Sequence, residues 1–494
     1  MEKDKHMKAA MRTKYFHLFQ PVDTKRRHLK PIASALIFAI AVFGTAATYA
    51  STTSSANVFV DFSTVGPPTS PLSVGSTIST YAGSGTNLIK GPQKALWQRY
   101  LTELGPLVWR VPLYYHDGQV GSSAGGVHSG DEGRAYIQGI KAIHGTPMIV
   151  VGGTTGDNDI QASDAEALVH YFNDKGGQNG GPVDRYVIGN EPDNGFGVDN
   201  YINGGAGSSG FHDIVTAMRN ATVRTLTLAG PAFTTWASYK YADFETFFAA
   251  DHSDVDVVDF HKYGAGDPIN NISLTDQYEQ GVQWIRQQVN SSFGTRADKI
   301  GIQVGEYNYN PFYSSAWQNA FYTSLNLVHT ASVIGHVLSA GGRAYQYSDN
   351  DGALGLITDG TGNNDQPVGS YVRLPVYWGI TVWTGGTQMP RYGSVMVSAT
   401  TSLQDFEVYA TDHAKKIILI NTSFNTDQHA VIDLAGMPNG RYSAWTYQRG
   451  MDPTDFTAGP QFQAPVAEAS NAWFTHGQVS IEVPWMSVAV ITLK

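Results

Sequence analysis

Short apolar runs alternate with amphipathic stretches through the middle of the chain. Seven runs are rich in β-branched and aromatic residues and lack strict alternation of apolar and polar positions. That pattern is typical of strands buried on both faces of a parallel sheet. The runs are residues 106–113, 146–153, 185–190, 226–232, 255–263, 299–308 and 343–348. An eighth strand is expected near residues 72–80, within a Pro/Ser/Gly-rich passage.

The stretches between these runs have helical spacing. Ser163 and Glu166 have the spacing of a capping box, and an apolar helical face follows them. Residues 278–289 and 316–340 carry similar apolar stripes. Strands that alternate with helices predict a (β/α)₈ barrel over residues 70–385. An open doubly wound sheet is the alternative, but it would need a Gly-rich phosphate-binding turn after its first strand, and the sequence has none there.

The pattern changes near residue 385. From there on, short runs alternate apolar and polar residues and are separated by Gly, Asn and Pro, which predicts an antiparallel β-sandwich over residues 386–494. The run NVFVDFS at residues 57–63 has the same alternation and lies outside the barrel series. Residues 51–69 are therefore interpreted as a linker and a strand that could join the sandwich.

Residues 1–50 differ from the rest in kind. A basic front end, an apolar run from Ile32 and small residues near Ala50 predict a secretory signal that is cleaved after Ala47 or Ala50. The alternative is an uncleaved membrane anchor, because a run of about 16–18 residues approaches the roughly 17–25 that span a bilayer. The signal hypothesis predicts a secreted or periplasmic protein without stable membrane association after cleavage.

Composition and charge exclude several classes of partner and site. Removal of residues 1–50 takes away nine basic and three acidic residues, so the net charge changes from −10 to −16. Such an acidic protein repels nucleic acid, and no nucleic-acid partner is expected. The chain has no Cys, which excludes disulfides, a thiol nucleophile and Cys-ligated zinc.

The sequence also gives no reason to expect a metal or another cofactor. The 15 His residues form no HExxH motif. Asp349, Asn350 and Asp351 lack the spacing of a calcium-binding EF-hand loop and are expected to form a solvated turn. The sequence leaves the oligomeric state open.

Two glutamates stand at the carboxyl ends of expected strands, where a barrel carries its chemistry. Glu191 follows the run 185–190, and Glu306 lies near the end of 299–308. A pair of carboxyl groups is the minimal apparatus for cleaving a glycosidic bond. A separation of about 5–5.5 Å would give retention of configuration and about 6.5–9.5 Å inversion. The sequence leaves this distance open.

Other side chains at the same strand ends are candidates for substrate binding. Arg110 lies in an apolar run, and a buried Arg needs an acidic partner. Tyr345 and Tyr347 lie on the last expected strand and could stack on sugar rings. Further aromatic candidates that follow strands are Trp236, Phe312, Tyr313 and Trp317.

Three motifs together resemble those of clan A of the glycoside hydrolases, a group of retaining (β/α)₈ enzymes. They are NEP at 190–192, HKY at 261–263 and GEYN at 305–308. The resemblance covers about residues 70–385 and is greatest to families 39 and 79, which include β-xylosidases, iduronidases and β-glucuronidases. It implies that Glu191 is the general acid/base and Glu306 the nucleophile.

The same resemblance implies roles for four more residues. Asn190 would hydrogen-bond the 2-hydroxyl group of the sugar. Tyr263 would hold Glu306, and Arg110 would keep it ionised. His261 would line the same subsite.

The sequence therefore predicts a secreted retaining β-glycoside hydrolase, similar to a xylosidase or glucuronidase, that acts on plant or microbial poly- or oligosaccharides. One alternative is a transglycosylase that uses the same covalent intermediate. Another is a catalytically inactive carbohydrate-binding protein.

Overall fold

The computed structural model describes residues 52–80, 86–116, 119–122, 132–152, 159–174, 178–205, 207–264, 268–310, 318–358, 369–447 and 464–494. The predicted signal or anchor segment lies outside these ranges, and so do Phe312, Tyr313 and Trp317. Among the described residues, no helix has the length and apolar character needed to cross a bilayer.

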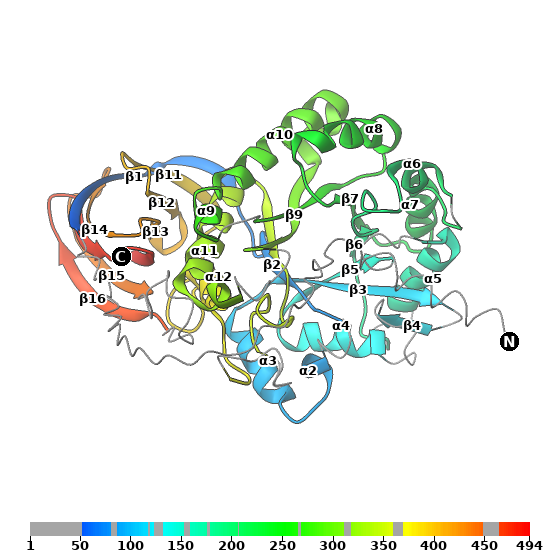
Figure 1. Ribbon diagram of the computed structural model, residues 1–494, viewed down its shortest axis with the longest axis horizontal. Coiled ribbons are helices and arrows are strands. Elements are labelled where there is room, and N and C mark those ends of the chain that lie inside the picture. Colours follow the sequence, from blue (N-terminus) through cyan, green and yellow to red (C-terminus); the bar gives the residue numbers. More distant parts are fainter. Residues whose placement is uncertain are drawn as a thin grey trace, which may run out of the picture. The chain divides into compact units, whose positions relative to one another are not determined.

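Eight parallel strands close into a barrel that is surrounded by helices (Figure 1). In chain order they are β2 (Val74–Thr77), β3 (Val108–His116), β5 (Thr146–Val151), β6 (Arg185–Ile188), β7 (Thr227–Phe233), β8 (Val257–Tyr263), β9 (Gly301–Asn308) and β10 (Arg343–Gln346). The ring closes because β2 pairs with both β10 and β3. This closure confirms the predicted (β/α)₈ barrel and excludes the open sheet. A further strand, β4 (Gln119–Ser122), pairs antiparallel with β3.

Most of the helices that cover the barrel bury one apolar face. The longer ones are α3 (Lys94–Glu103), α4 (Glu132–Ala142), α5 (Ala162–Asn173), α7 (Phe211–Asn220), α8 (Tyr241–Asp251), α10 (Asp276–Ser292), α11 (Ser324–Ser339) and α12 (Pro375–Thr384). Of these, α11 and α12 are buried on almost all sides. Shorter helices in the connections are α2 (Thr86–Ile89), α6 (Val198–Asn203) and α9 (Pro268–Ile272), with 3₁₀ turns η1 (Ser238–Lys240), η2 (Gly294–Lys299) and η3 (Gln318–Tyr322).

The start of α5 differs from the predicted capping box. Ser163 lies inside the helix, which begins at Ala162, and the preceding Gln161 makes no side-chain cap. Instead, the backbone N–H of Ala162 donates to Oγ of Ser209 over 3.0 Å. A hydroxyl group 47 residues away in the chain therefore satisfies a donor that the local motif was expected to satisfy.

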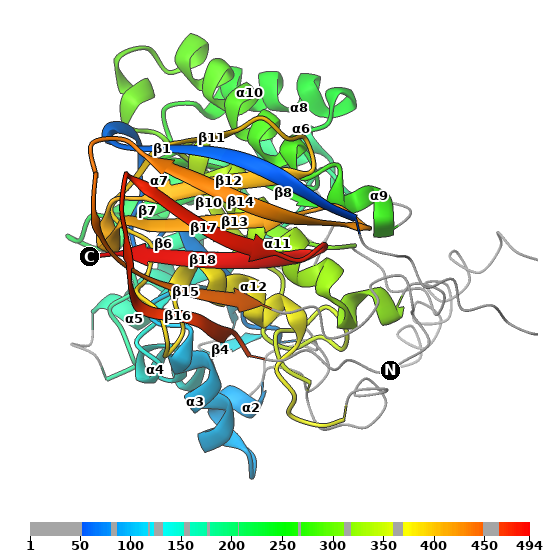
Figure 2. The ribbon, with the colours of Figure 1, turned by 90° about the vertical axis from the view of Figure 1, so that its left-hand side faces the viewer.

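The β-domain is a nine-stranded sheet that encloses its own apolar core. Its strands, in sheet order, are β16 (Val466–Phe474), β15 (Gly440–Tyr447), β18 (Ser487–Leu493), β13 (Lys416–Asn421), β12 (Phe406–Thr411), β11 (Val395–Thr401), β1 (Thr52–Pro68), β14 (Thr426–Leu434) and β17 (Gln478–Val483). A purely antiparallel sheet was predicted, but the sheet contains one parallel pair. Strand β1 pairs antiparallel with β11 and parallel with β14 (Figure 2). The β-domain therefore begins with the strand that precedes the barrel.

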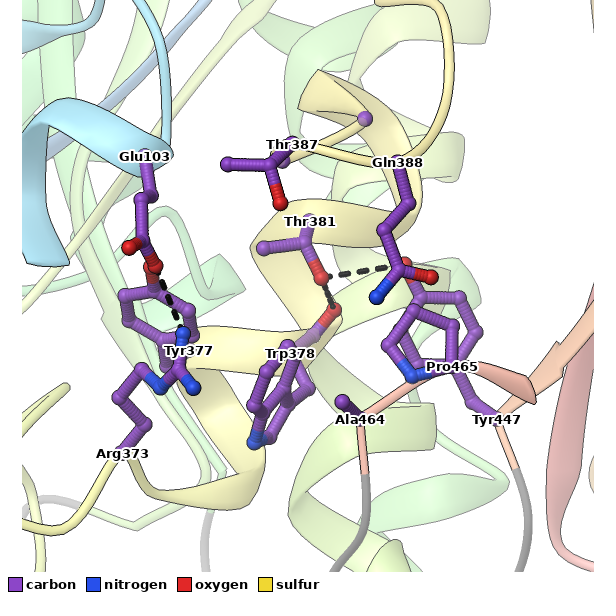
Figure 3. Close-up of a pocket in the computed structure, with 12 residues that line it drawn as sticks. Glu103, Arg373, Tyr377, Trp378, Thr381, Thr387, Gln388, Tyr447, Ala464 and Pro465 are labelled. Carbon is purple, nitrogen blue, oxygen red and sulfur yellow. Dashed lines mark hydrogen bonds and ion pairs between the residues drawn. The ribbon is translucent and has the colours of Figure 1, made fainter.

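Helices α11 and α12 contact the β-domain directly. Oγ of Ser332 donates to Glu407 over 2.8 Å, and the hydroxyl groups of Thr381 and Tyr447 lie 3.0 Å apart. Figure 3 shows the second contact beside a pocket of about 210 Å³ between α12 and β15. In the same view Arg373 pairs with Glu103 over 2.7 Å. The contacts of Ser332 and Thr381 therefore link helices of the barrel to the β-domain.

Candidate active site

Glu191 leaves the carboxyl end of β6 in an unusual backbone conformation. Its φ is 50°, in the left-handed region that non-glycine residues rarely adopt. The backbone N–H of Glu191 donates to the carbonyl oxygen of Ala232 at the end of β7 over 3.0 Å, which holds the turn in place. Backbone strain of this kind clusters at functional sites.

Glu306 is aimed into the barrel by a β-bulge in β9. On the β8 side, Phe260 pairs with Val304 and His261 pairs with Glu306, so Gly305 is an extra residue. The pairing with β10 shows the same shift between Val304 and Tyr307. A bulge changes which face of a sheet the following side chains occupy. If β9 instead alternated regularly through Gly305, Glu306 would share the outward face of Val304 and its carboxyl group would point away from the barrel interior.

Two donors hold the carboxylate of Glu306. Nη1 of Arg110 donates to Oε1 over 2.9 Å, and the hydroxyl group of Tyr263 donates to Oε2 over 2.6 Å. Burial by itself raises the pKa of Glu306, but the charges of His261 and Arg110 and the hydrogen bonds from Tyr263 and Arg110 outweigh it and lower the pKa. The structure thus favours an ionised Glu306.

His261 lies between the two glutamates and is completely buried. Nδ1 of its ring is 2.9 Å from Oε1 of Glu191, to which it donates, and 3.6 Å from Oε2 of Glu306. Nε2 lies 3.4 Å from Nη2 of Arg110. Burial lowers the pKa of His261, but the two carboxylates outweigh burial and raise it. The imidazole therefore links the two acids electrostatically.

The two carboxylates are close together. One oxygen atom of Glu191, one of Glu306 and a ring nitrogen of His261 all lie within 4.8 Å of one another. In glycosidases a separation of about 5–5.5 Å between the two carboxyl groups accompanies direct attack by a carboxylate, and about 6.5–9.5 Å leaves room for a water molecule between them. Atoms of these types could also hold a metal ion, but Arg110 and His261 already donate hydrogen bonds to the carboxylates, and the Arg110 cation opposes a second positive charge.

The structure brings most of the predicted site residues together. Arg110, Glu191, His261, Tyr263 and Glu306 form one hydrogen-bonded cluster at the carboxyl ends of the strands. Asn190 directly precedes Glu191 and is almost buried. Tyr347 lies near Tyr263, whose pKa it helps to raise after burial and the two glutamates.

Tyr345 is not brought to this cluster. Its ring is completely buried within the barrel, beside Val108 and Met148. Its hydroxyl group donates over 2.9 Å to the carbonyl oxygen of Leu72, at the opposite, amino end of the barrel. Tyr345 therefore fills the barrel interior. The ring of Trp236 packs against Gly281 of α10.

Asp349 and Asn350 do not form the solvated turn that their sequence suggested. Both side chains are completely buried. Asp349 accepts the backbone N–H of Ser79 over 2.8 Å and the indole N–H of Trp97 over 3.2 Å. Burial raises the pKa of Asp349 to about 7. This carboxyl group ties the end of β10 to the end of β2 and to α3.

Sequence reasoning missed one charged residue of the site region, Asp259 on β8. It is completely buried and accepts a 2.8 Å hydrogen bond from Nε2 of Gln303 on β9. The signal for it was present, because Asp259, His261 and Tyr263 have the two-residue spacing of one strand face.

The sequence matches no protein-family model and no curated protein sequence. Solved structures of similar fold include a family 51 arabinofuranosidase from Xanthomonas axonopodis pv. citri (TM-score 0.67, 13% identity, covering 89% of this chain and 100% of that chain). They also include a family 44 xyloglucanase from Paenibacillus polymyxa (TM-score 0.60, 12% identity, 89% and 100%). A third is a family 51 α-L-arabinofuranosidase from Bifidobacterium longum (TM-score 0.65, 14% identity, 89% and 100%).

These likenesses establish that the chain has the fold of the clan A TIM-barrel glycoside hydrolases. The similar structures named here belong to families 51 and 44. They support the expected fold, and they do not single out families 39 and 79.

Proposed function

We propose that the protein is a retaining glycoside hydrolase with Glu306 as nucleophile and Glu191 as general acid/base. The observation that carries the proposal is the approach of the two carboxylates to within 4.8 Å at the carboxyl end of the barrel. Two carboxyl groups at this spacing suit a double displacement through a covalent intermediate.

The first step requires the two acids to be in different protonation states. Ionised Glu306 attacks the anomeric carbon while Glu191 gives its proton to the departing glycosidic oxygen, so the bond from the anomeric carbon to that oxygen breaks. In the second step Glu191 takes a proton from water, and the resulting hydroxide displaces Glu306 from the same carbon. Each step inverts the configuration at that carbon, so the product retains it.

The hydrogen-bonded cluster supports these roles. Arg110 and Tyr263 donate hydrogen bonds that stabilise the negative charge of Glu306 before attack. The same hydrogen bonds stabilise that charge when Glu306 leaves the anomeric carbon as a carboxylate in the second step. Through its N–H, His261 fixes the orientation of the carboxyl group of Glu191. Asn190 and Tyr347 are proposed to contact the sugar ring bound between the two acids.

The sugar itself is a separate part of the proposal. The sequence favours β-xylosides and β-glucuronides, and the similar structures are those of arabinofuranosidases and a xyloglucanase. The substrate class is therefore proposed to be a neutral or uronic glycoside of plant or microbial polysaccharides. Export is proposed from the basic and apolar pattern of residues 1–50.

The test is hydrolysis of a panel of 4-nitrophenyl glycosides that comprises β-xyloside, β-glucuronide, β-glucoside, β-galactoside and α-L-arabinofuranoside. For any substrate cleaved, proton NMR of the first-formed product gives the anomeric configuration. Retention by the wild type and loss of turnover in Glu306→Gln support the proposal. Inversion contradicts it. Saccharide binding without turnover across this panel and a matched set of oligosaccharides would favour a carbohydrate-binding protein, and sugar transfer at high acceptor concentration would favour a transglycosylase.

A further inference from the structure

Asp259 on β8 lies against Gly305, the residue that precedes the candidate nucleophile. Its side chain is completely buried, and Nε2 of Gln303 donates to its Oδ2 over 2.8 Å. Among the described residues, Oδ1 of Asp259 has no hydrogen-bond partner. A buried carboxyl group is costly unless charge or hydrogen bonding compensates for its desolvation. Asp259 is therefore expected to have a function that offsets this cost.

The first contact of interest is with the bulge at Gly305. A Cβ atom added to Gly305 would lie only 2.1 Å from Oδ1 of Asp259, so the carboxyl group occupies the space that a side chain would need. The carbonyl oxygen of the same glycine accepts a 2.5 Å hydrogen bond from Nη1 of Arg110. Asp259 and Arg110 thus both contact the residue that sets the direction of Glu306.

The second relationship is electrostatic. Arg110 on β3 carries the positive charge that interacts with both carboxyl groups, Glu306 and Asp259. The pKa of Asp259 is raised above its ordinary value, mainly by burial and further by the charge of Glu306. The charges of Arg110 and His261 and the hydrogen bond from Gln303 lower it and offset part of that increase. The other ionisable groups that interact with Asp259 are Tyr345 on β10 and Tyr201 on α6. Within the described part of the chain, Arg110 is therefore the permanent cation near Asp259, and His261 adds a second positive charge when it is protonated.

We propose that Asp259 is a positioning residue for Glu306, whose ionised carboxylate braces the Gly305 bulge and shares the positive charge of Arg110 with the nucleophile. The inference rests on the proposed function for its catalytic meaning. The effect of the Asp259 charge on the pKa of Glu306 does not depend on catalysis and can be measured without a substrate.

Asp259→Asn separates charge from shape. The amide oxygen of Asn can still accept the hydrogen bond from Gln303, and the amide has nearly the same volume as the carboxylate, but the negative charge is lost. Without this like charge, the pKa of Glu306 falls, because nearby anions disfavour a second ionised carboxylate. We expect the acidic limb of the pH profile of kcat/KM to move down by at least about half a unit. We also expect kcat to fall by roughly tenfold with little change in KM, because a less basic carboxylate is a poorer nucleophile.

The matched control is Asp251→Asn. Asp251 is also a buried aspartate with a raised pKa, but it lies on α8, away from the cluster. This variant should leave the acidic limb where it is in the wild type. If Asp259→Asn does not fold, Gln303→Met takes its place. It removes the amide group that donates to Asp259, so the carboxyl group of Asp259 becomes neutral at a higher pH than in the wild type. The acidic limb should therefore move in the same direction as in Asp259→Asn.

A measurement that needs no substrate completes the test. Carboxyl ¹³C NMR titration of Glu-labelled protein, with the Glu306 signal assigned by its loss in Glu306→Gln, gives the pKa of Glu306 in wild type and Asp259→Asn. A lower pKa in the variant supports the inference even if no glycoside is cleaved, in which case only the proposed function fails. An unchanged pKa of Glu306, together with an unmoved acidic limb in an active enzyme, overturns the inference and leaves the proposed function in place.

Discussion

The hydroxyl oxygen of Tyr263 lies 2.6 Å from Oε2 of Glu306. The two residues come from neighbouring strands, β8 and β9, and meet at the carboxyl end of the barrel. Burial, followed by the charge of Glu306, raises the pKa of Tyr263 well above its ordinary value, so the phenol keeps its proton and remains a donor. Tyr263 is therefore a permanent hydrogen-bond donor to Glu306, the proposed nucleophile.

Tyr263→Phe removes this donor and leaves the ring in place. The hydrogen bond lowers the pKa of Glu306, so its loss raises that pKa and moves the acidic limb of kcat/KM to higher pH. We expect a loss of roughly 10²-fold in kcat, in the range observed when one preorganised donor is removed. The measurement is a pH profile of hydrolysis for both proteins. A variant with the wild-type limb and rate would show that the bond has no catalytic role.

Glu191→Ala tests the general acid/base. Substrates with poor leaving groups need the proton from Glu191, whereas an activated aryl glycoside departs without it. Hydrolysis of natural oligosaccharides should fall by roughly 10³-fold or more, and formation of the covalent intermediate from dinitrophenyl glycosides should change little. Added azide should restore turnover of the activated substrate by replacing water as the nucleophile. Equal losses on both substrate classes would contradict the assignment.

Arg110→Met removes the cation that contacts Glu306. The charge of Arg110 lowers the pKa of Glu306, so the acidic limb should move to higher pH, as in Tyr263→Phe but further. Loss of one partner from a buried ion pair should also cost roughly 3–5 kcal/mol in the free energy of unfolding. Arg224→Met is the matched control, because Arg224 pairs with Asp184 at the surface. Urea denaturation and pH profiles of both variants would show whether the two arginines differ in this way.

The contact of α11 with the β-domain should make stability depend on pH. His336 lies 2.9 Å from Glu279 and 3.7 Å from Glu407. Burial lowers the pKa of His336, but these two glutamates outweigh it and raise the pKa to about 9. The folded-state pKa is above that of the unfolded chain. The stabilisation, roughly 3 kcal/mol, is therefore complete below about pH 6.5 and is lost as the pH rises through about 9.

Urea denaturation between pH 6 and pH 10 measures this effect. The wild type should lose free energy of unfolding across that range, and His336→Gln should lack this component of the loss. A wild-type curve that matches the variant at every pH would show that the ion pairs do not stabilise the folded state.

The sequence by itself determined the features that depend on short stretches of chain. The lengths and spacing of apolar runs predict a parallel barrel, because strands buried on both faces need continuous apolar residues. The position of a residue within its run also predicts which strand end it occupies. For this reason Glu191 and Glu306 could be predicted to lie at one face of the barrel.

The tertiary structure alone decided the features that depend on contacts between distant residues. The bulge at Gly305 appears only when β9 is paired with its neighbours, and it sets the direction of Glu306. Tyr345 and Tyr347 are two residues apart in the sequence, but Tyr345 lies on β10 in the barrel interior, whereas Tyr347 follows the end of β10 and lies near the cluster. The role proposed for Asp259 depends on its contact with Gly305 on β9 and on its charge interaction with Arg110 on β3. Local periodicity assigns a residue to an element and a face, whereas the packing of separate elements determines which residues it contacts.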